Sequence, residues 1–248
     1  MTSLLDEFER LYDPRTGGWH IPEKLVAPFT PEDVEKWLAE HPLRFSPVER
    51  EVGRFFAALI HLLQPSTVLE TGTNFGYSAY SIAGALRLLG GNRKLFTIDL
   101  WSCDHLFKGT EAEPSITFIQ GNSLEIDLGV LPSSFDMLFL DSDHTYKTIV
   151  GEMNRFAPML RMHGFMVLHD TLYYDGVALA VKQLMDTGAF EVVNFPTPRD
   201  HGRGTRPPGI SIARKVRKVK PGFLKPKRTY LNVEINLSNR KDTDASLL

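Results

Sequence analysis

Short apolar runs alternate with amphipathic segments from residue 67 onward. The short runs are typical of buried strands, and the amphipathic segments repeat their apolar residues with helical spacing. Strands that alternate with helices build a parallel sheet whose two faces the helices cover. The predicted strands span residues 67–71, 94–100, 116–120, 135–141, 164–170, 190–195 and 209–213, and the predicted helices span 76–89, 145–160 and 175–187.

The connection between the last two predicted strands differs from the others. Residues 196–208 are polar, rich in glycine and proline, and lack helical spacing. Because a parallel return needs a crossover that is usually a helix, this loop predicts an antiparallel pair. The sequence therefore predicts an α/β fold in three layers (α/β/α), with a seven-stranded, mostly parallel sheet that ends in an antiparallel hairpin.

The first 65 residues have helical character. Ser46 and Pro47 place a capping hydroxyl before a proline at the first helical position, and Thr30 and Pro31 repeat this arrangement. Apolar residues then recur at helical spacing from residue 52 to residue 63, which predicts a helix that packs on the core. We expect a helical extension at 1–65, a ligand-binding domain at 66–215 and a basic, then polar tail at 216–248.

Composition narrows the class of protein. A chain of 248 residues with 42% hydrophobic and 23% charged residues has ordinary globular composition. The only cysteine, Cys103, excludes an internal disulfide and fits a reducing compartment. The first residues lack the pattern of a signal peptide, and no apolar run is long enough to span a membrane. We therefore expect a cytoplasmic protein without a membrane span, and a homo-oligomer stays open.

Eight lysines and arginines fall within residues 214–228. A run of cations can bind a phosphate-rich partner, but a solvated face is the commoner explanation. The net charge of −2 and the lack of a base-recognition motif argue against nucleic acid as a partner. The run could instead cover the site or contact another subunit.

The first predicted strand ends in an acid-x-Gly-x-x-x-Gly turn at residues 70–76. Ligands of open α/β sheets bind beyond the carboxyl ends of the strands, where this turn lies. Gly72 lets backbone approach a ligand, and Gly76 opens a helix whose free N–H groups attract a carboxylate. A dinucleotide site would need glycine where Thr73 stands, so the turn favours a ligand without phosphates. Glu70 would then face a cationic group such as an amine.

Other residues at strand ends extend this predicted site. Asp99 ends the second strand, where a carboxylate can accept both hydroxyl groups of a ribose. Trp101 would supply an aromatic wall nearby. Asn122 and Ser123 follow the third strand, where their side chains would meet the edge of an adenine. Together with the turn, these positions predict a nucleoside site.

Polar groups also gather after the fourth and fifth predicted strands. Asp141 and His144 follow one strand, His169 and Asp170 end the other, and neighbouring parallel strands bring all four to one edge. Asp141 and Asp170 are hard oxygen ligands suited to Mg²⁺, and His169 could complete a set of three. His144 would then be the general base that takes a proton from a hydroxyl nucleophile.

Simpler explanations of these residues stay open. Asp141 could only accept from the N–H groups of the following helix, and His144 could cap that helix. His169 could be a hydrogen-bonded core histidine. Asp143 could orient His144. Tyr173 and Tyr174, which follow the fifth strand, could line an acceptor pocket or only pack.

With these motifs, residues 67–213 resemble the Rossmann-like fold of class I S-adenosylmethionine-dependent methyltransferases. Within that class the stretch is similar to small-molecule O-methyltransferases, including the catechol and macrocin (macrolide-sugar) enzymes, a group that overlaps the cephalosporin-hydroxylase-like proteins. The resemblance implies methylation of a hydroxyl group on a small acceptor, with His144 as the proton acceptor. It implies that S-adenosylmethionine contacts Glu70, Gly72, Thr73, Gly76, Asp99, Trp101, Asn122, Ser123 and Asp141, and that a metal binds Asp141, His169 and Asp170.

One position departs from the resemblance. His169 stands where those enzymes normally have a carboxylate, which leaves Mg²⁺, Mn²⁺ and metal-free chemistry open. Two other functions also stay open. His144, His169 and one carboxylate could form the iron site of an oxygenase, although that triad usually occurs on a β-barrel. The chain could also bind the cofactor without catalysis.

Overall fold

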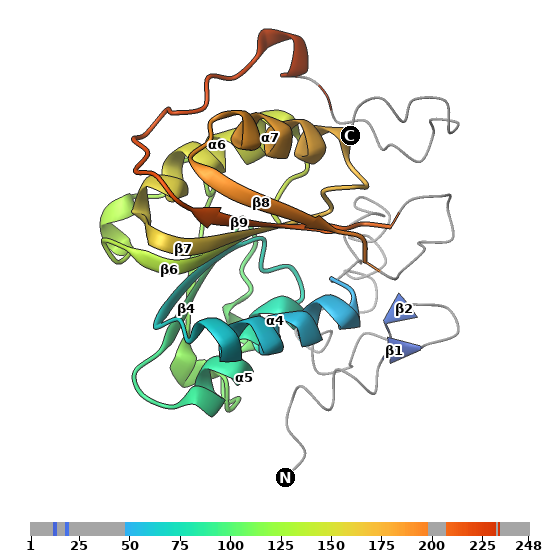
Figure 1. Ribbon diagram of the computed structural model, residues 1–248. Helices are drawn as coiled ribbons and strands as arrows, with labels where there is room; N and C mark the ends of the chain where they lie inside the picture. Colours follow the sequence, from blue (N-terminus) through green and yellow to red (C-terminus); the bar gives the residue numbers. More distant parts are fainter. Residues whose placement is uncertain (1–11, 14–17, 20–47, 198–206, 232, 234–248) are drawn as a thin grey trace. The chain divides into compact units, whose positions relative to one another are not determined.

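The computed structural model in Figure 1 describes residues 12–13, 18–19, 48–197, 207–231 and 233. It contains a seven-stranded sheet with the order β5-β4-β3-β6-β7-β9-β8, and a separate pair, β1 (Tyr12–Asp13) and β2 (Gly18–Trp19). The large sheet consists of β3 (Thr67–Thr71), β4 (Lys94–Asp99), β5 (Ile116–Gln120), β6 (Phe135–Leu140), β7 (Leu160–His169), β8 (Phe190–Phe195) and β9 (Ile210–Lys215).

The strand directions confirm the predicted fold class. Strand β3 pairs with β6, β4 with β5, and β6 with β7, all in parallel, whereas β9 pairs antiparallel with both β7 and β8. The seven-stranded, mostly parallel sheet with a terminal antiparallel hairpin is therefore present, and helices flank it. The chain divides into two compact units, one containing residues 73–122 with the part before residue 67, and the other containing 67–72 with the part after residue 122.

In the first unit, α4 (Arg50–Leu63) packs against α5 (Tyr77–Leu89), and α5 packs on β4. The approach of the two helices is close at Gly53, because a Cβ atom there would lie 2.6 Å from the Tyr77 hydroxyl oxygen. Helix α4 begins later than its sequence predicted, with Glu49 at the N-cap position and without a side-chain cap. The expected caps at Thr30 and Ser46 lie outside the described residues.

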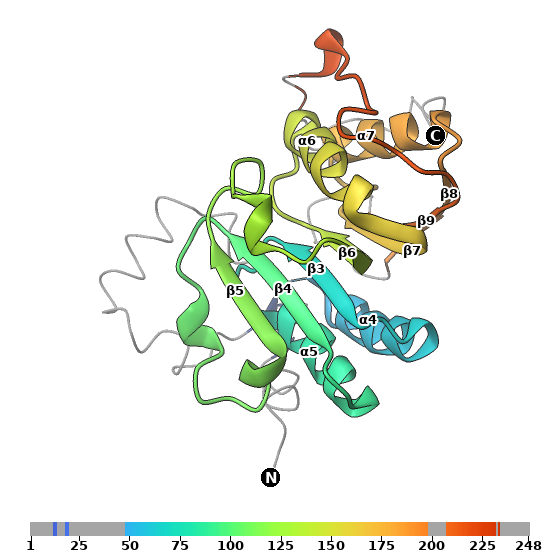
Figure 2. The same ribbon diagram turned by 90° about the vertical axis from the view of Figure 1, so that its left-hand side faces the viewer.

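In the second unit, α6 (Tyr146–Phe156) and α7 (Asp175–Asp186) lie side by side against the β6-β7-β9-β8 part of the sheet (Figure 2). Strand β7 begins at Leu160, four residues before the predicted start at Gly164. The β6–β7 register shifts within this part of β7: Phe135 pairs with Leu160, whereas Met137 pairs with Phe165.

Strand β9 continues to Lys215, beyond its predicted end at Ala213, and Lys215 is buried. Its Nζ atom donates hydrogen bonds to the carbonyl oxygens of Ala157 at 2.7 Å, Pro158 at 3.4 Å and Leu160 at 2.6 Å. Burial lowers the pKa of the Lys215 ammonium. The expectation that the basic run is a solvated face is therefore wrong for Lys215. Its ammonium group instead donates hydrogen bonds to backbone carbonyl groups in the segment between α6 and β7.

We expect Lys215→Met to lower the free energy of unfolding by about 2 kcal/mol, because it leaves buried carbonyl groups without a donor. Urea denaturation would measure the loss. Lys218→Met is the matched control: Lys218 is exposed, so its replacement should change stability by less than about 0.5 kcal/mol. Equal stabilities of the two variants would contradict the structural role of Lys215.

The chain after β9 returns along α6 and α7, within the same unit (Figure 1). Leu224 is buried, and its backbone N–H and carbonyl groups both bond to the Asn154 side chain at 2.8 Å. The Gln183 amide donates to the Lys225 carbonyl oxygen at 2.8 Å. Exposed cations follow this packed backbone at Arg217, Lys218, Lys220, Lys225, Lys227 and Arg228. Their role as a solvated face and the boundary at residues 215–216 stay predictions. Across the described segments, none of the helices has the length and apolar character needed to cross a bilayer.

Candidate active site

The turn after β3 touches the residues that follow β6. Gly72 has a φ of +85°, and a Cβ atom there would lie 2.1 Å from the Asp141 carbonyl oxygen. The Asp141 N–H group donates to the Thr71 carbonyl oxygen at 3.1 Å. Gly72 is thus required by this backbone contact, a reason that its sequence position did not reveal.

Within the first unit, Asp99 organises the remainder of the predicted nucleoside site. One carboxylate oxygen accepts from the Asn74 N–H group at 2.9 Å and the other from the Trp101 N–H group at 3.0 Å. Gly76 occupies the N-cap position of α5 with a φ of +78°. The Thr73 hydroxyl bonds to the Thr97 hydroxyl at 2.7 Å. Asp99 therefore fixes two loops from the carboxyl end of β4.

The remaining predicted cofactor residues differ in exposure. Glu70 is fully buried and Ser123 is buried, whereas Asn122 is half-buried and Trp101 is 45% exposed. The Ser123 hydroxyl hydrogen bonds to Glu152. Contact of these residues with a ligand stays a prediction, and for Ser123 the structure supplies a protein partner.

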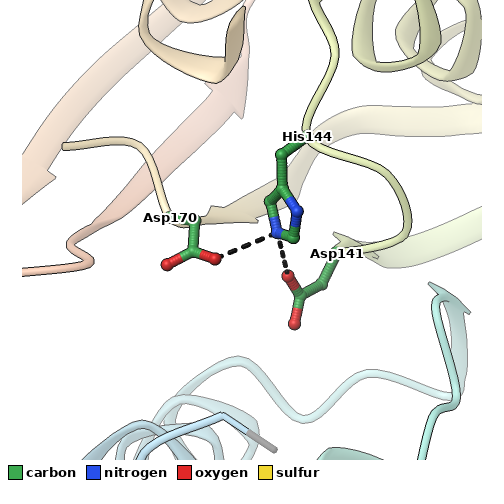
Figure 3. Close-up of side chains that lie close together, drawn as sticks. All are labelled: Asp141, His144 and Asp170. Atoms are coloured by element: carbon green, nitrogen blue, oxygen red, sulfur yellow. Dashed lines mark ion pairs between the residues drawn. The ribbon is translucent and has the colours of Figure 1, made fainter. Parts of the chain in front are cut away.

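The second unit brings two aspartates and a histidine together (Figure 3). Asp141 follows β6 and Asp170 follows β7, so the parallel pairing of these strands places both at one edge. The His144 Nε2 atom lies 3.5 Å from Asp141 Oδ1 and 2.9 Å from Asp170 Oδ2. Asp170 has a φ of +58°, a left-handed conformation that costs energy outside glycine and that recurs at functional sites.

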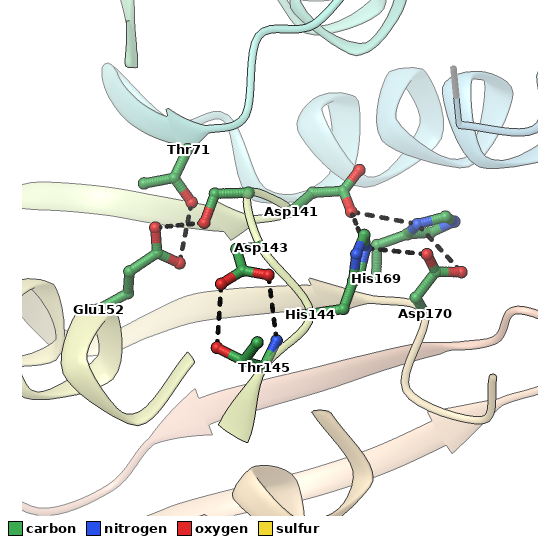
Figure 4. Close-up of polar contacts among 9 residues, drawn as sticks. Thr71, Asp141, Asp143, His144, Thr145, Glu152, His169 and Asp170 are labelled. Atoms are coloured by element: carbon green, nitrogen blue, oxygen red, sulfur yellow. Dashed lines mark hydrogen bonds and ion pairs between the residues drawn. The ribbon is translucent and has the colours of Figure 1, made fainter. Parts of the chain in front are cut away.

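His169 approaches the same two carboxylates from the end of β7 (Figure 4). Its Nδ1 atom lies 3.3 Å from Asp141 Oδ1 and 3.6 Å from Asp170 Oδ1. The structure thus gathers all four residues predicted for the chemical site. Its possible metal site with all ligand atoms within 4.8 Å consists of Asp141, His144 and Asp170, whereas the sequence favoured His169 as the third ligand.

The electrostatics of this cluster follow from burial and charge pairing. Burial lowers the pKa of His144, but the close pairing with the carboxylates of Asp141 and Asp170 outweighs it and raises the pKa to about 10. Burial raises the pKa of each aspartate, and the interactions with the two histidines, His169 first, outweigh it and hold that pKa below its usual value. Without another cation, His144 therefore carries a proton at neutral pH and pairs with two carboxylates.

The donor set fits a divalent cation. Two carboxylates and an imidazole within 4.8 Å of one another are ligands that Mg²⁺ and Mn²⁺ accept. Asp170 Oδ1 is buried, and no described residue donates a hydrogen bond to it. That oxygen keeps a lone pair for a ligand.

The contacts of the loop decide between the simpler explanations. Thr145 is the N-cap of α6, since its hydroxyl accepts from the Thr148 N–H group at 3.2 Å. The cap is therefore neither Asp141 nor His144. Asp143 accepts hydrogen bonds from the Thr145 and Thr148 hydroxyls at 2.9 and 2.7 Å. These bonds tie Asp143 to the cap of α6 rather than to His144.

Tyr174 supplies a contact that sequence reasoning left undecided. Its ring stacks on the His144 imidazole, with centroids 4.1 Å apart and an interplanar angle of 13°. Tyr173 meets Tyr174 edge to face, with centroids 5.0 Å apart. The stack holds the plane of the His144 ring. Its only signal in the sequence was the position of two aromatic residues after the fifth strand.

Comparison with known proteins shows what the chain is similar to. Residues 69–171, from β3 to just past Asp170, match a family described as a methyltransferase domain. Among curated proteins, the rhamnosyl O-methyltransferase of Mycobacterium tuberculosis is 28% identical over 123 residues, which cover 47% of this chain and 50% of that protein. The Mycobacterium leprae protein of the same name is 28% identical over 116 residues. The chain spans about half the length of these curated relatives.

Solved structures agree with this class at the level of the fold. The O-methyltransferase TomG of Streptomyces achromogenes, in complex with S-adenosylmethionine, has a TM-score of 0.61 at 19% identity, covering 80% of this chain and 92% of its own. An O-methyltransferase of Bacillus cereus, in complex with S-adenosylhomocysteine, has a TM-score of 0.58 at 15% identity, covering 79% and 92%. At these identities the matches show a shared fold, which is the Rossmann-like methyltransferase fold predicted from the sequence.

Proposed function

We propose that this chain is an S-adenosylmethionine-dependent O-methyltransferase that methylates a hydroxyl group of a small molecule with the help of a divalent cation. The observation that carries the proposal is the cluster of Asp141, His144, His169 and Asp170 at the ends of β6 and β7. It lies inside the segment that matches the methyltransferase family. Methyl transfer to oxygen needs such a group, because a hydroxyl holds its proton too tightly to react unaided.

S-adenosylmethionine supplies an electrophilic methyl group on a sulfonium. For its ribose hydroxyls, Asp99 offers a carboxylate already oriented by the Asn74 and Trp101 N–H groups. The predicted contacts of Glu70, Gly72, Thr73, Gly76, Asn122, Ser123 and Asp141 complete the proposed cofactor site.

A divalent cation would lower the pKa of an acceptor hydroxyl and orient it. Asp141 and Asp170 would hold it with one imidazole, and exposure separates the two candidates. The His169 side chain is 7% exposed, whereas that of His144 is 26% exposed. We therefore assign His169 to the cation and His144 to the proton of the acceptor, because only a reachable imidazole can take that proton.

The acceptor class follows from the same groups. A cation with open positions binds neighbouring hydroxyl oxygens, as in a catechol or a sugar. The rhamnosyl O-methyltransferases bear a name that fits the second of these. The test of the two acceptor classes uses 3,4-dihydroxybenzoate as the catechol and methyl rhamnoside as the sugar. Each is incubated with S-adenosylmethionine and Mg²⁺ or Mn²⁺, and formation of the methyl ether is measured. Substrate oxidation with Fe²⁺ and O₂, without methyl transfer, would instead identify the oxygenase.

The cofactor site has its own test. Asp99→Ala should weaken S-adenosylhomocysteine binding at least tenfold, or about 1.4 kcal/mol, because the ribose hydroxyls lose their acceptor. Isothermal calorimetry measures the affinity. Asp104→Ala, whose side chain is 41% exposed in the same unit, serves as the control and should bind normally. Unchanged affinity in Asp99→Ala would remove Asp99 from the site, and tighter binding of NAD would overturn the cofactor assignment.

A further inference from the structure

A buried glutamate lies behind the proposed site without joining the cation cluster. Glu152 projects from α6 and has no exposed surface. Its Oε1 atom accepts a hydrogen bond from the Ser142 hydroxyl at 2.6 Å, and its Oε2 atom accepts from the Thr71 hydroxyl at 3.2 Å (Figure 4). The Ser123 hydroxyl is a third partner.

The first two hydroxyl groups belong to the segments that carry the site. Thr71 directly precedes Gly72, and Ser142 directly follows Asp141. These segments already touch through their backbones at Gly72 and Asp141. A single carboxyl group on α6 therefore joins the turn after β3 to the loop after β6, on the side away from the two histidines.

A buried carboxyl group is a costly way to stabilise a helix. Burial raises the pKa of Glu152 to about 7, although hydrogen bonds from Ser123, Ser142 and Thr71 lower it in part. An apolar side chain would avoid this desolvation cost. Glu152 instead fixes the distance between two strand ends, because its two oxygens accept hydrogen bonds from hydroxyl groups at those two ends.

We propose that Glu152 is a positioning residue for methyl transfer, which sets Asp141 and its loop against the Gly72 turn. This inference rests on the proposed function. Glu152 has no exposed surface with which to touch an acceptor or a cofactor. Its effect passes through Ser142 to Asp141, and a displacement of Asp141 by about 1 Å is enough to lower a rate about 10²-fold.

The test compares Glu152→Ala, Glu152→Gln and the control Lys215→Met in the full chain. Glutamine keeps an oxygen that accepts from one hydroxyl and an N–H group that donates to the other, whereas alanine keeps neither. Lys215 lies at the opposite end of β9 from the strand ends of the site, since its neighbour Arg214 pairs with Phe165 while Ile210 pairs with His169. Lys215→Met thus reports on lost stability alone.

We expect Glu152→Ala to lower kcat about 10²-fold while the KM for S-adenosylmethionine stays within about threefold. Glu152→Gln and Lys215→Met should keep kcat within about threefold. If Lys215→Met lost as much kcat as Glu152→Ala, lost stability alone would explain the lower kcat of Glu152→Ala, and the proposal would be overturned. An unchanged kcat in Glu152→Ala would also overturn it.

A second measurement is independent of turnover. Hydrogen exchange by mass spectrometry on Glu152→Ala should accelerate about tenfold in peptides covering residues 140–146 and stay unchanged in peptides covering β4 and β5. Unchanged exchange at 140–146 would contradict the positioning role. If the wild-type chain transfers no methyl group to either acceptor, the proposed function fails, and this measurement still decides whether Glu152 holds the loop.

Discussion

Asp170→Asn is expected to abolish cation-dependent methyl transfer while leaving S-adenosylhomocysteine affinity nearly unchanged. The substitution keeps the shape of the side chain but removes the charge of an oxygen ligand, and Mg²⁺ and Mn²⁺ bind neutral amides much more weakly. Asp141→Asn should behave in the same way, and so should the wild-type chain in excess EDTA. Turnover assays with added Mg²⁺ or Mn²⁺ measure the first effect, and calorimetry measures the second.

The same assays distinguish the roles of the two histidines. His144→Ala should keep Mn²⁺ binding while its rate falls about 10²–10⁴-fold, the usual contribution of a general base. His169→Ala should weaken Mn²⁺ binding first, because we assign its imidazole to the cation. If His144→Ala instead weakened Mn²⁺ binding and His169→Ala kept it, the two roles would be exchanged. The cation ligands would then be Asp141, His144 and Asp170, whose ligand atoms lie within 4.8 Å of one another. Full activity in excess EDTA would rule out the cation as a requirement for methyl transfer.

The central strands could be predicted from the sequence because they are largely buried, as in β3 and β6. Runs such as 135–140 are apolar almost throughout, and β3, β5 and β8 have the predicted bounds. The ends were harder to predict where packing decides them. Strand β9 extends to Lys215 because a lysine finds carbonyl partners inside the fold, a contact between residues far apart in sequence.

The candidate site could be predicted only in part. Acids and histidines at the ends of neighbouring parallel strands must meet, so Asp141 and Asp170 followed from topology alone. The choice between His144 and His169 depends on side-chain directions, which a sequence does not contain. Glu152 gave no signal, since a glutamate in a helix usually faces solvent. Only the structure shows it bonded to hydroxyls from two strand ends.

Glu152 should also make the stability of the chain depend on pH. Its pKa is about 7 in the folded protein and near its ordinary value of 4.5 in the unfolded chain. The native state therefore holds a proton that the unfolded state releases, and folding is favoured fully below about pH 4.5. As the pH rises through 7 that contribution is lost, amounting to about 3 kcal/mol when complete.

Glu152→Gln removes this titration, because an amide stays neutral while it keeps the hydrogen bonds to Thr71 and Ser142. The free energy of unfolding of Glu152→Gln relative to wild type should therefore rise by about 2–3 kcal/mol between pH 5 and pH 8. Urea denaturation at each pH measures the difference, and Glu191→Gln, at an exposed position on β8, is the matched control. The lowered pKa values of Asp141 and Asp170 act at lower pH, where ionised carboxylates stabilise the fold, and they cancel in the comparison. A difference that is constant across this range would show that the Glu152 carboxyl is already ionised in the folded chain at pH 5.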